Sequence, residues 1–98
     1  MEREIVWNKR PSKYLTQALK RISEESYLQA ERVEEAILTR LEKLKQKPEK
    51  YPTDKFKRNN QGNYRAFETH SYRIAYRFTD KEIRILRIRH VKQEPKEY

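Results

Sequence analysis

The chain has 98 residues, of which 24 are lysine or arginine and 15 are aspartate or glutamate, so its net charge is +9. This length predicts one domain, residues 1–98, and the charge indicates a nucleic acid or an acidic protein as partner. With no cysteine, two histidines and one glycine, we expect no disulfide, no metal site and no nucleotide cofactor, and no apolar run is long enough to span a membrane.

The first half of the chain predicts a short strand followed by two helices. Residues 3–7, REIVW, form the strand candidate, which we expect to join an edge of a sheet. Apolar residues from Tyr14 to Ile22 recur at helical spacing and predict a first helix of about three turns. Ser26 is the predicted N-cap of a second, longer helix, which ends before Pro48. We expect the two helices to form a hairpin that packs on the sheet.

Residues 48–63, PEKYPTDKFKRNNQGN, form the one long irregular segment. Basic side chains alternate there with Phe56, a pattern typical of loops that hold a nucleic-acid backbone and stack a base. We therefore predict nucleic-acid contacts by Lys55, Lys57 and Arg58. The alternative is that Tyr51 and Phe56 are buried anchors of the loop and that the basic side chains are only solvated.

The last third of the chain predicts a three-stranded meander. Three runs alternate as strands do, at residues 64–68, 72–78 and 83–91. They predict a twisted antiparallel sheet with one apolar face and one basic face. The predicted fold class is therefore α+β, with the element order β-α-α-β-β-β.

The hairpin at residues 80–82 is predicted to have a three-residue loop. This loop places Arg73 opposite Arg89 and Tyr76 opposite Leu86. A two-residue loop would turn two arginines towards the helices, which costs several kcal/mol unless each arginine is paired.

The hairpin at residues 69–71 is predicted by the same reasoning to pair Ala66 with Ile74 on the apolar face. Arg65 and Phe67 then lie on the basic face. Arginines that face one another across strands repel, and a bound phosphate would relieve the repulsion because guanidinium groups match phosphate oxygens. We therefore predict an anion site between Arg65, Arg73 and Arg89. We also predict nucleic-acid contacts by Phe67, Arg87 and Arg89. The alternative is that these arginines pair with Glu68, Glu82 or Glu94.

The order strand, helical hairpin, loop and meander, with the segments NYR, SYRIAYR and ILRIRHVKQEPKEY, resembles the RelE/ParE superfamily of bacterial toxins from type II toxin–antitoxin systems. In the RelE branch the resemblance implies a metal-independent, ribosome-dependent mRNA endoribonuclease that uses the RNA 2′-hydroxyl as nucleophile and inhibits translation. In the ParE branch it implies a toxin that inhibits DNA gyrase and cleaves nothing. A third interpretation is a basic RNA-binding module without catalysis.

The resemblance also implies catalytic residues for the RelE branch. Arg73 matches the phosphate-stabilising arginine, and Arg65 matches a basic residue of the acid–base machinery. Tyr98 matches the tyrosine that stacks on the substrate base or orients the attack. Lys92 stands where the family can have an arginine, and His90 where other branches have a histidine acid or base. Arginine is too basic to be a general base, so proton transfer falls to His90 or a tyrosine.

A toxin of this superfamily implies a cognate antitoxin with an acidic and apolar segment. In the predicted register, Ile83 and Ile85 are in phase with the arginines, where exposed apolar side chains need a cover. We therefore predict that the antitoxin docks on them or over the basic face. The expected location is the cytoplasm, because the N-terminal segment has no signal-peptide pattern.

Overall fold

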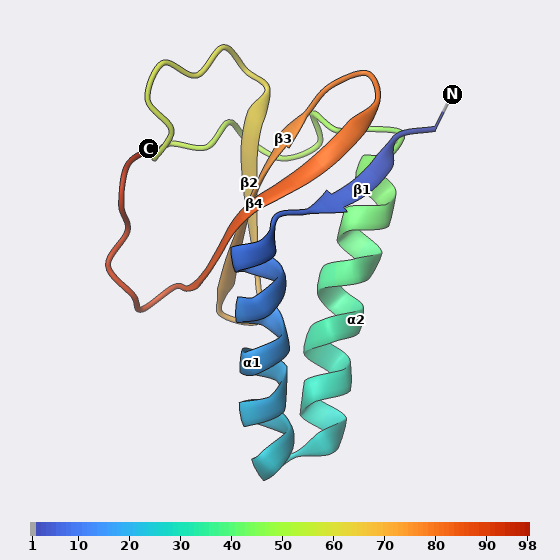
Figure 1. Ribbon diagram of the computed structural model, residues 1–98, viewed down its shortest axis with the longest axis vertical. Helices are drawn as coiled ribbons and strands as arrows, with labels where there is room; N and C mark the ends of the chain where they lie inside the picture. Colours follow the sequence, from blue (N-terminus) through green and yellow to red (C-terminus); the bar gives the residue numbers. More distant parts are fainter. Residues whose placement is uncertain (1) are drawn as a thin grey trace.

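The computed structural model describes residues 2–98 and confirms the α+β class and the order β-α-α-β-β-β (Figure 1). The elements are β1 (Glu4–Trp7), α1 (Lys9–Glu25), α2 (Tyr27–Leu44), β2 (Tyr64–Thr69), β3 (Tyr72–Phe78) and β4 (Glu82–His90). The strand order in the sheet is β1-β4-β3-β2. Strands β2, β3 and β4 form the predicted antiparallel meander, whereas β1 joins β4 in parallel, so the complete sheet is mixed.

Helices α1 and α2 form the predicted hairpin over one face of the sheet (Figure 1). Ser26 is the N-cap of α2, as predicted, because its side chain accepts a hydrogen bond from the Gln29 backbone N–H at 3.1 Å. This contact satisfies one of the N–H groups that have no partner within the helix. Helix α1 has 17 residues and is therefore longer than the sequence predicts. It begins at Lys9 and accommodates Pro11 in its first turn, where proline is tolerated.

The hydrophobic core lies between the helical hairpin and the helix-facing side of the sheet. Its largest side chains with less than 2% exposure are Ile37, Leu41, Leu44, Ile74, Tyr76, Ile83 and Ile85. Complete burial of one such aliphatic side chain contributes about 1.5 to 3 kcal/mol. The core therefore fixes which side of each strand faces the helices.

A β-bulge interrupts the pairing of β3 with β4. Ala75 pairs with Arg87, but the next residue of β3, Tyr76, pairs with Ile85. Leu86 is the extra residue that a bulge inserts into one strand. The predicted pairing of Tyr76 with Leu86 is therefore wrong by one residue.

The predicted three-residue loop at residues 80–82 is also wrong, because Phe78 pairs with Ile83 and the Thr79 N–H donates to the Glu82 carbonyl, which leaves a two-residue turn. The bulge, and not the loop, keeps Arg87 and Arg89 away from the helices.

The bulge changes the phase of β4 between its two halves. The half before the bulge turns Ile83 and Ile85 towards the helices, where both have 0% exposure. The prediction that these isoleucines lie beside the arginines and contact an antitoxin is therefore wrong, because neither presents surface to a partner. The half after the bulge keeps the predicted register, with Arg73 opposite Arg89.

The hairpin between β2 and β3 has a two-residue turn in place of the predicted three-residue loop. His70 and Ser71 have φ angles of 50° and 70°, and a type I′ turn needs positive φ at both central residues. This turn pairs Phe67 with Ile74. The predicted pairing of Ala66 with Ile74 is therefore wrong, and every side chain of β2 changes face.

Arg65 and Phe67 consequently lie on the helix-facing side and not on the basic face as predicted. Phe67 is 4% exposed and packs against Tyr51 and Tyr76, with ring centroids 4.8 and 6.4 Å apart. It cannot stack on a nucleic-acid base from this position. The Arg65 guanidinium donates hydrogen bonds of 2.9 to 3.2 Å to the main-chain carbonyls of Glu49, Tyr51 and Gly62. Arg65 therefore holds the loop against β2 and leaves the predicted anion site.

Candidate functional site

The side of the sheet that points away from the helices carries a row of arginines from β3 and β4. We call it the arginine face, and its arginines are Arg73, Arg77, Arg84, Arg87 and Arg89. Two cross-strand pairs, Arg73 with Arg89 and Arg77 with Arg84, set like charges opposite one another, which destabilises a sheet unless the charges are compensated. The predicted basic face thus exists without Arg65 and Phe67.

The loop at residues 48–63 and the C-terminal segment at residues 91–98 together cover the centre of the arginine face. Ala66 and Ala75 lie on this face by their register, yet they are only 5% and 4% exposed. The loop and the segment are joined by two backbone hydrogen bonds, from the Tyr98 N–H to the Phe56 carbonyl at 3.0 Å and from the Arg58 N–H to the Tyr98 carbonyl at 2.7 Å. Figure 1 shows the two segments meeting beside the sheet.

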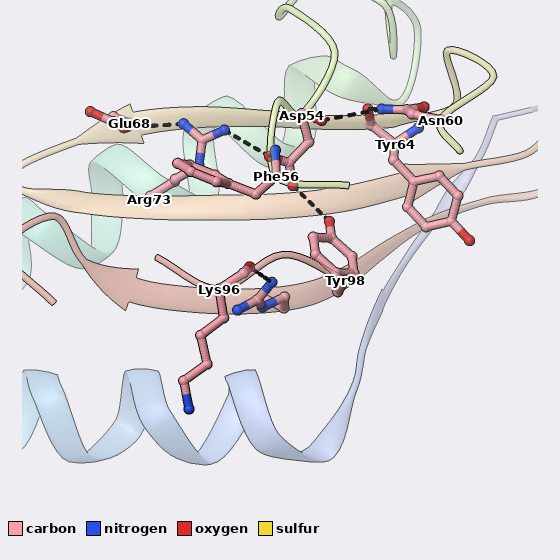
Figure 2. Close-up of polar contacts among 9 residues, drawn as sticks. Asp54, Phe56, Asn60, Tyr64, Glu68, Arg73, Lys96 and Tyr98 are labelled. Atoms are coloured by element: carbon pink, nitrogen blue, oxygen red, sulfur yellow. Dashed lines mark hydrogen bonds and ion pairs between the residues drawn. The ribbon is translucent and has the colours of Figure 1, made fainter. Parts of the chain in front are cut away.

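Asp54 is the centre of the polar network beneath this cover (Figure 2). Its carboxylate accepts hydrogen bonds from Arg73 Nη2 at 2.8 Å, the Tyr98 hydroxyl at 2.7 Å and the Phe56 N–H at 3.1 Å. Burial alone would raise the pKa of Asp54, but the hydrogen bonds from Arg73, Tyr98 and the Phe56 N–H lower the pKa below its ordinary value. The chain therefore supplies its own anion to the arginine face.

Asp54 was not among the residues that the sequence pattern indicated. The residue follows no strand or helix periodicity, and its partner Tyr98 is 44 positions away in the chain. The one signal in the sequence is compositional: Asp54 is the only acidic residue between Pro52 and Gly62, in a stretch that is basic or polar except for Phe56.

Arg73 and Tyr98, two of the predicted catalytic residues, are brought together by Asp54. Arg73 also pairs with Glu68 at 3.1 Å, so each of its terminal nitrogens contacts a carboxylate, and its side chain is 12% exposed. Burial and the hydrogen bond to Asp54 raise the pKa of Tyr98 well above its ordinary value, so its hydroxyl is no base at neutral pH. In this arrangement both residues are partners of one carboxylate.

Phe56 lies between Arg73 and Arg89. Its ring centroid is 4.9 Å from the Arg73 guanidinium carbon and 5.3 Å from that of Arg89, within the range of cation–π contact. Arg87 stacks in the same way on the Tyr98 ring at 4.5 Å and donates a hydrogen bond of 2.7 Å to a main-chain carbonyl of the C-terminal segment. Phe56 is thus an anchor of the loop, as the alternative interpretation of residues 48–63 expects. A single nitrogen of Arg89, Nη1, donates to the main-chain carbonyls of His90, Val91 and Gln93 at 3.2 to 3.4 Å.

The loop residues that were predicted to contact nucleic acid lie at the edge of this cover, which we call the rim of the arginine face. Lys55 and Arg58 are exposed. Lys57 is half-buried, with its Nζ 4.7 Å from the centroid of the Tyr64 ring and 5.5 Å from that of the Tyr98 ring. Lys55 and Arg58 are therefore accessible to a partner, whereas Lys57 helps to hold the C-terminal segment.

His90 and Lys92 lie apart from the Asp54 network. The His90 ring packs edge-on against Tyr72 at 5.4 Å on the helix-facing side, and its Nδ1 accepts a hydrogen bond from the Lys92 N–H at 3.1 Å. Lys92 is exposed in the turn that follows β4. Of the five predicted catalytic residues, the fold therefore brings together only Arg73 and Tyr98.

The far end of the arginine face is compensated less completely. Arg84 pairs with Glu82 at 2.7 Å and donates to the Asn8 side chain at 2.9 Å. Within residues 2–98, the buried Nε of Arg77 has no hydrogen-bond partner. The alternative that the arginines of the predicted site pair with glutamates is thus confirmed for Arg73 with Glu68, whereas Glu82 pairs with Arg84, which was not one of those arginines.

The acidic and histidine side chains are dispersed over the molecule. Among residues 2–98, no three histidine, aspartate or glutamate side chains gather where they could hold a metal ion. In the same range, neither helix has the length and apolar character that crossing a bilayer requires.

Comparison with known proteins gives a match to one protein family. The family model described as ParE toxin of type II toxin-antitoxin system, parDE, matches residues 5–95. The match begins in β1, includes the whole meander and Asp54, and ends before Tyr98. No curated protein matches the chain.

Proposed function

Since the chain belongs to the ParE toxin family of type II toxin–antitoxin systems, we propose that it inhibits its target by binding and not by cleaving RNA. The target that the ParE resemblance implies is DNA gyrase. The observation that carries the proposal is the engagement of Arg73 and Tyr98 by one buried carboxylate of the chain, Asp54.

Cleavage of RNA through its 2′-hydroxyl needs three groups in one place. A base takes the hydroxyl proton, an acid protonates the leaving oxygen, and cations stabilise the dianionic phosphorane. Here Arg73 already contacts two carboxylates, the Tyr98 hydroxyl donates to one of them, and the His90 ring is on the opposite side of the sheet. This separation favours a binding toxin.

A binding toxin needs accessible charge and a stable surface, and the rim of the arginine face has both. Lys55 and Arg58 are exposed there, on a loop that hydrogen bonds to the C-terminal segment. Exposed cations on a pre-organised surface favour fast association with an acidic protein. We propose that this rim contacts the target.

Membership of the family implies a cognate antitoxin as partner. We propose that the antitoxin lays an acidic segment over the same rim, because the toxin has an excess of nine positive charges and this rim holds accessible ones. The antitoxin would then exclude the target from the surface that the target needs.

The second candidate function is the mRNA endoribonuclease. The observation in its favour is that Arg73 and Tyr98 share one carboxylate, so a substrate phosphate that displaced Asp54 would meet both side chains at once. Such a displacement would return Arg73 to the phosphate-stabilising role that the RelE resemblance implies.

A gyrase supercoiling assay, run beside a ribosome-programmed mRNA cleavage assay, tests the proposal. We expect the purified toxin to inhibit supercoiling and to leave mRNA intact. The variant Lys55→Ala/Arg58→Ala should weaken inhibition, whereas Lys20→Ala/Lys81→Ala, which removes the same charge from exposed sites elsewhere, should not. Cleavage of mRNA that is lost in both Arg73→Ala and Tyr98→Phe would establish the second candidate instead. Inactivity in both assays would reject both functions and leave a basic binding module.

A further inference from the structure

A second basic surface lies on the helix layer, and none of the residues lining it belongs to the arginine face. An open pocket of about 550 Å³ lies between α2, the segment that follows α2 and the turn between β2 and β3. We call this pocket the α2 groove. Its cations and the small residues between them are Arg32, Ala36, Thr39, Arg40, Lys43 and Lys50. The groove is thus separate from the site described above.

The residues that line the α2 groove extend along α2 from Arg32 to Lys43, with small side chains between the cations. Ala36 and Thr39 lie between the cations of α2, at the spacing that places residues on one side of a helix. From Arg32 to Lys43 the helix rises about 16 Å. Each strand of B-DNA carries one phosphate per about 3.4 Å of helix axis, so several phosphates can lie along this length. Small side chains on the floor let a polymer backbone approach the helix.

The cations of the groove have few partners within the protein. Arg40 Nη1 donates to the Tyr51 hydroxyl at 3.3 Å, and Lys50 lies 5.6 Å from the centroid of the Tyr51 ring. Within the described part of the chain, no ion pair involves a cation of the groove, and Glu35 is the one carboxylate in its lining. The positive charge of the groove is therefore largely uncompensated.

An acidic ridge on α2 borders the groove. It consists of Glu31, Glu34 and Glu35, beside Thr39. These carboxylates would repel a polyanion and favour its binding on the cationic side of the helix. Beyond Lys43 and Lys50 the surface is mixed in charge, since the adjoining pocket is lined by Lys47 and by Glu2 and Glu42.

We propose that the α2 groove binds the phosphate backbone of a nucleic acid without regard to base sequence. An acidic protein segment is the less favoured occupant, because protein partners usually bury apolar or aromatic anchors. The groove offers charged, polar and small side chains. Of the two rings in its lining, that of Tyr51 is already packed on Phe67 and the other is the polar imidazole of His70. This activity goes beyond inhibition of a target, since it would hold the toxin on DNA or RNA.

Fluorescence anisotropy on the full chain tests the proposal. The probes are labelled mixed-sequence oligonucleotides of about 15 nucleotides, as single-stranded RNA, single-stranded DNA and duplex DNA. We expect Lys43→Ala/Lys50→Ala to weaken binding on the order of tenfold at low salt. The slope of log K against log salt should become shallower by about 0.7 per lost contact on single strands and about 0.9 on duplex. The three probes distinguish RNA from DNA as the source of the phosphates.

Two matched variants keep the test specific. Lys20→Ala/Lys81→Ala removes the same net charge from exposed sites outside the groove, and Lys55→Ala/Arg58→Ala removes it from the rim of the arginine face. Both should bind the probes more tightly than the groove variant. Equal losses in the groove variant and the first control would overturn the proposal, as would a loss confined to the rim variant. Binding to poly-glutamate without binding to any oligonucleotide would overturn it too, and so would binding to neither. If the double variant fails to fold, Arg32→Ala replaces it, because Arg32 is an exposed cation of the groove whose loss should also weaken oligonucleotide binding.

Discussion

The arginine face and the α2 groove carry similar charge, but the protein compensates that charge on one surface and not on the other. On the arginine face, Arg73 contacts Asp54 and Glu68, and Arg87 and Arg89 donate to main-chain carbonyls. In the groove, Arg40 donates to the Tyr51 hydroxyl, and the Lys50 ammonium lies over the Tyr51 ring. Neither contact supplies a negative charge. The comparison teaches that the number of cations does not locate a binding surface. Cations whose donors are satisfied internally stabilise the fold, and cations with unused donors are available to a ligand.

The largest effect on this difference between the two surfaces is expected from removing Asp54, the internal anion of the arginine face. Asp54→Asn should lower the free energy of unfolding by about 3 kcal/mol, because it leaves a mostly buried guanidinium without its buried charge partner. Urea denaturation measures the change. The side chain of Glu68, the other partner of Arg73, is 52% exposed. The matched variant Glu68→Gln should therefore lower the free energy of unfolding by less than about 1 kcal/mol. Equal costs for the two variants would show that burial of the carboxylate is not what matters.

Removal of the Tyr98 contacts should have the next largest effect. Tyr98→Phe loses the hydrogen bond to Asp54 at a cost of about 1 kcal/mol, while Tyr98→Ala also loses the ring on which Arg87 stacks, for about 1 kcal/mol more. We expect amide hydrogen exchange at Arg58, whose N–H donates to the Tyr98 carbonyl, to accelerate more in Tyr98→Ala than in Tyr98→Phe. Unchanged exchange in both variants would mean that Tyr98 does not hold the C-terminal segment.

The pH dependence of stability provides a smaller, graded test of the same carboxylate. The pKa of Asp54 is lowered in the folded protein, whereas an unfolded aspartate titrates near about 3.9. The contribution of Asp54 to stability is therefore fully present above about pH 4 and is lost as the pH falls through the folded pKa. Denaturation curves collected between about pH 3 and pH 6 should show a steeper loss of stability towards acid for the native sequence than for Asp54→Asn. If the stability of the two proteins fell equally with pH, Asp54 would not be the group responsible for the loss of stability in acid.

The smallest effect is expected in the α2 groove. Lys43→Ala/Lys50→Ala should change the free energy of unfolding by less than about 0.5 kcal/mol for each substitution, because neither lysine is part of an ion pair within residues 2–98. Thermal or urea unfolding measures this value. A loss as large as that of Asp54→Asn would place these lysines among the structural cations and remove the contrast between the two surfaces.

The element order could be predicted because each element repeats its apolar residues at its own period. The cap at Ser26 followed from a local rule and was confirmed. The pairing of Arg73 with Arg89 was also confirmed, although a two-residue turn with a bulge at Leu86 produces it and not the predicted three-residue loop. The bulge left one mark in the sequence: Ile85 and Leu86 are consecutive apolar residues in an otherwise alternating strand. Such a doublet marks the point at which a strand changes phase.

The site was harder to predict than the fold, for two physical reasons. His70 and Ser71 adopt positive φ without the asparagine or glycine that usually indicates a type I′ turn, so the register of β2 was predicted one residue out. The contact between Asp54 and Tyr98 joins two segments that lack periodicity, and no local rule relates them. The residues of the site that come from β3 could be predicted, whereas those that the loop places could not.

The extra residue Leu86 shifts the phase of the sequence within β4, yet the isoleucines before and after it are all buried and the arginines before and after it all lie on the arginine face. Such a strand tolerates changes of composition gradually, because each side chain can be replaced without moving its neighbours. Its length has a different tolerance on each side of the present count. Loss of Leu86 would join Ile85 directly to Arg87, so that simple alternation would keep every isoleucine and arginine of the strand on its present face. A further inserted residue would need a second bulge, since without one it would force a choice between hiding guanidinium groups among aliphatic side chains and exposing isoleucines to water.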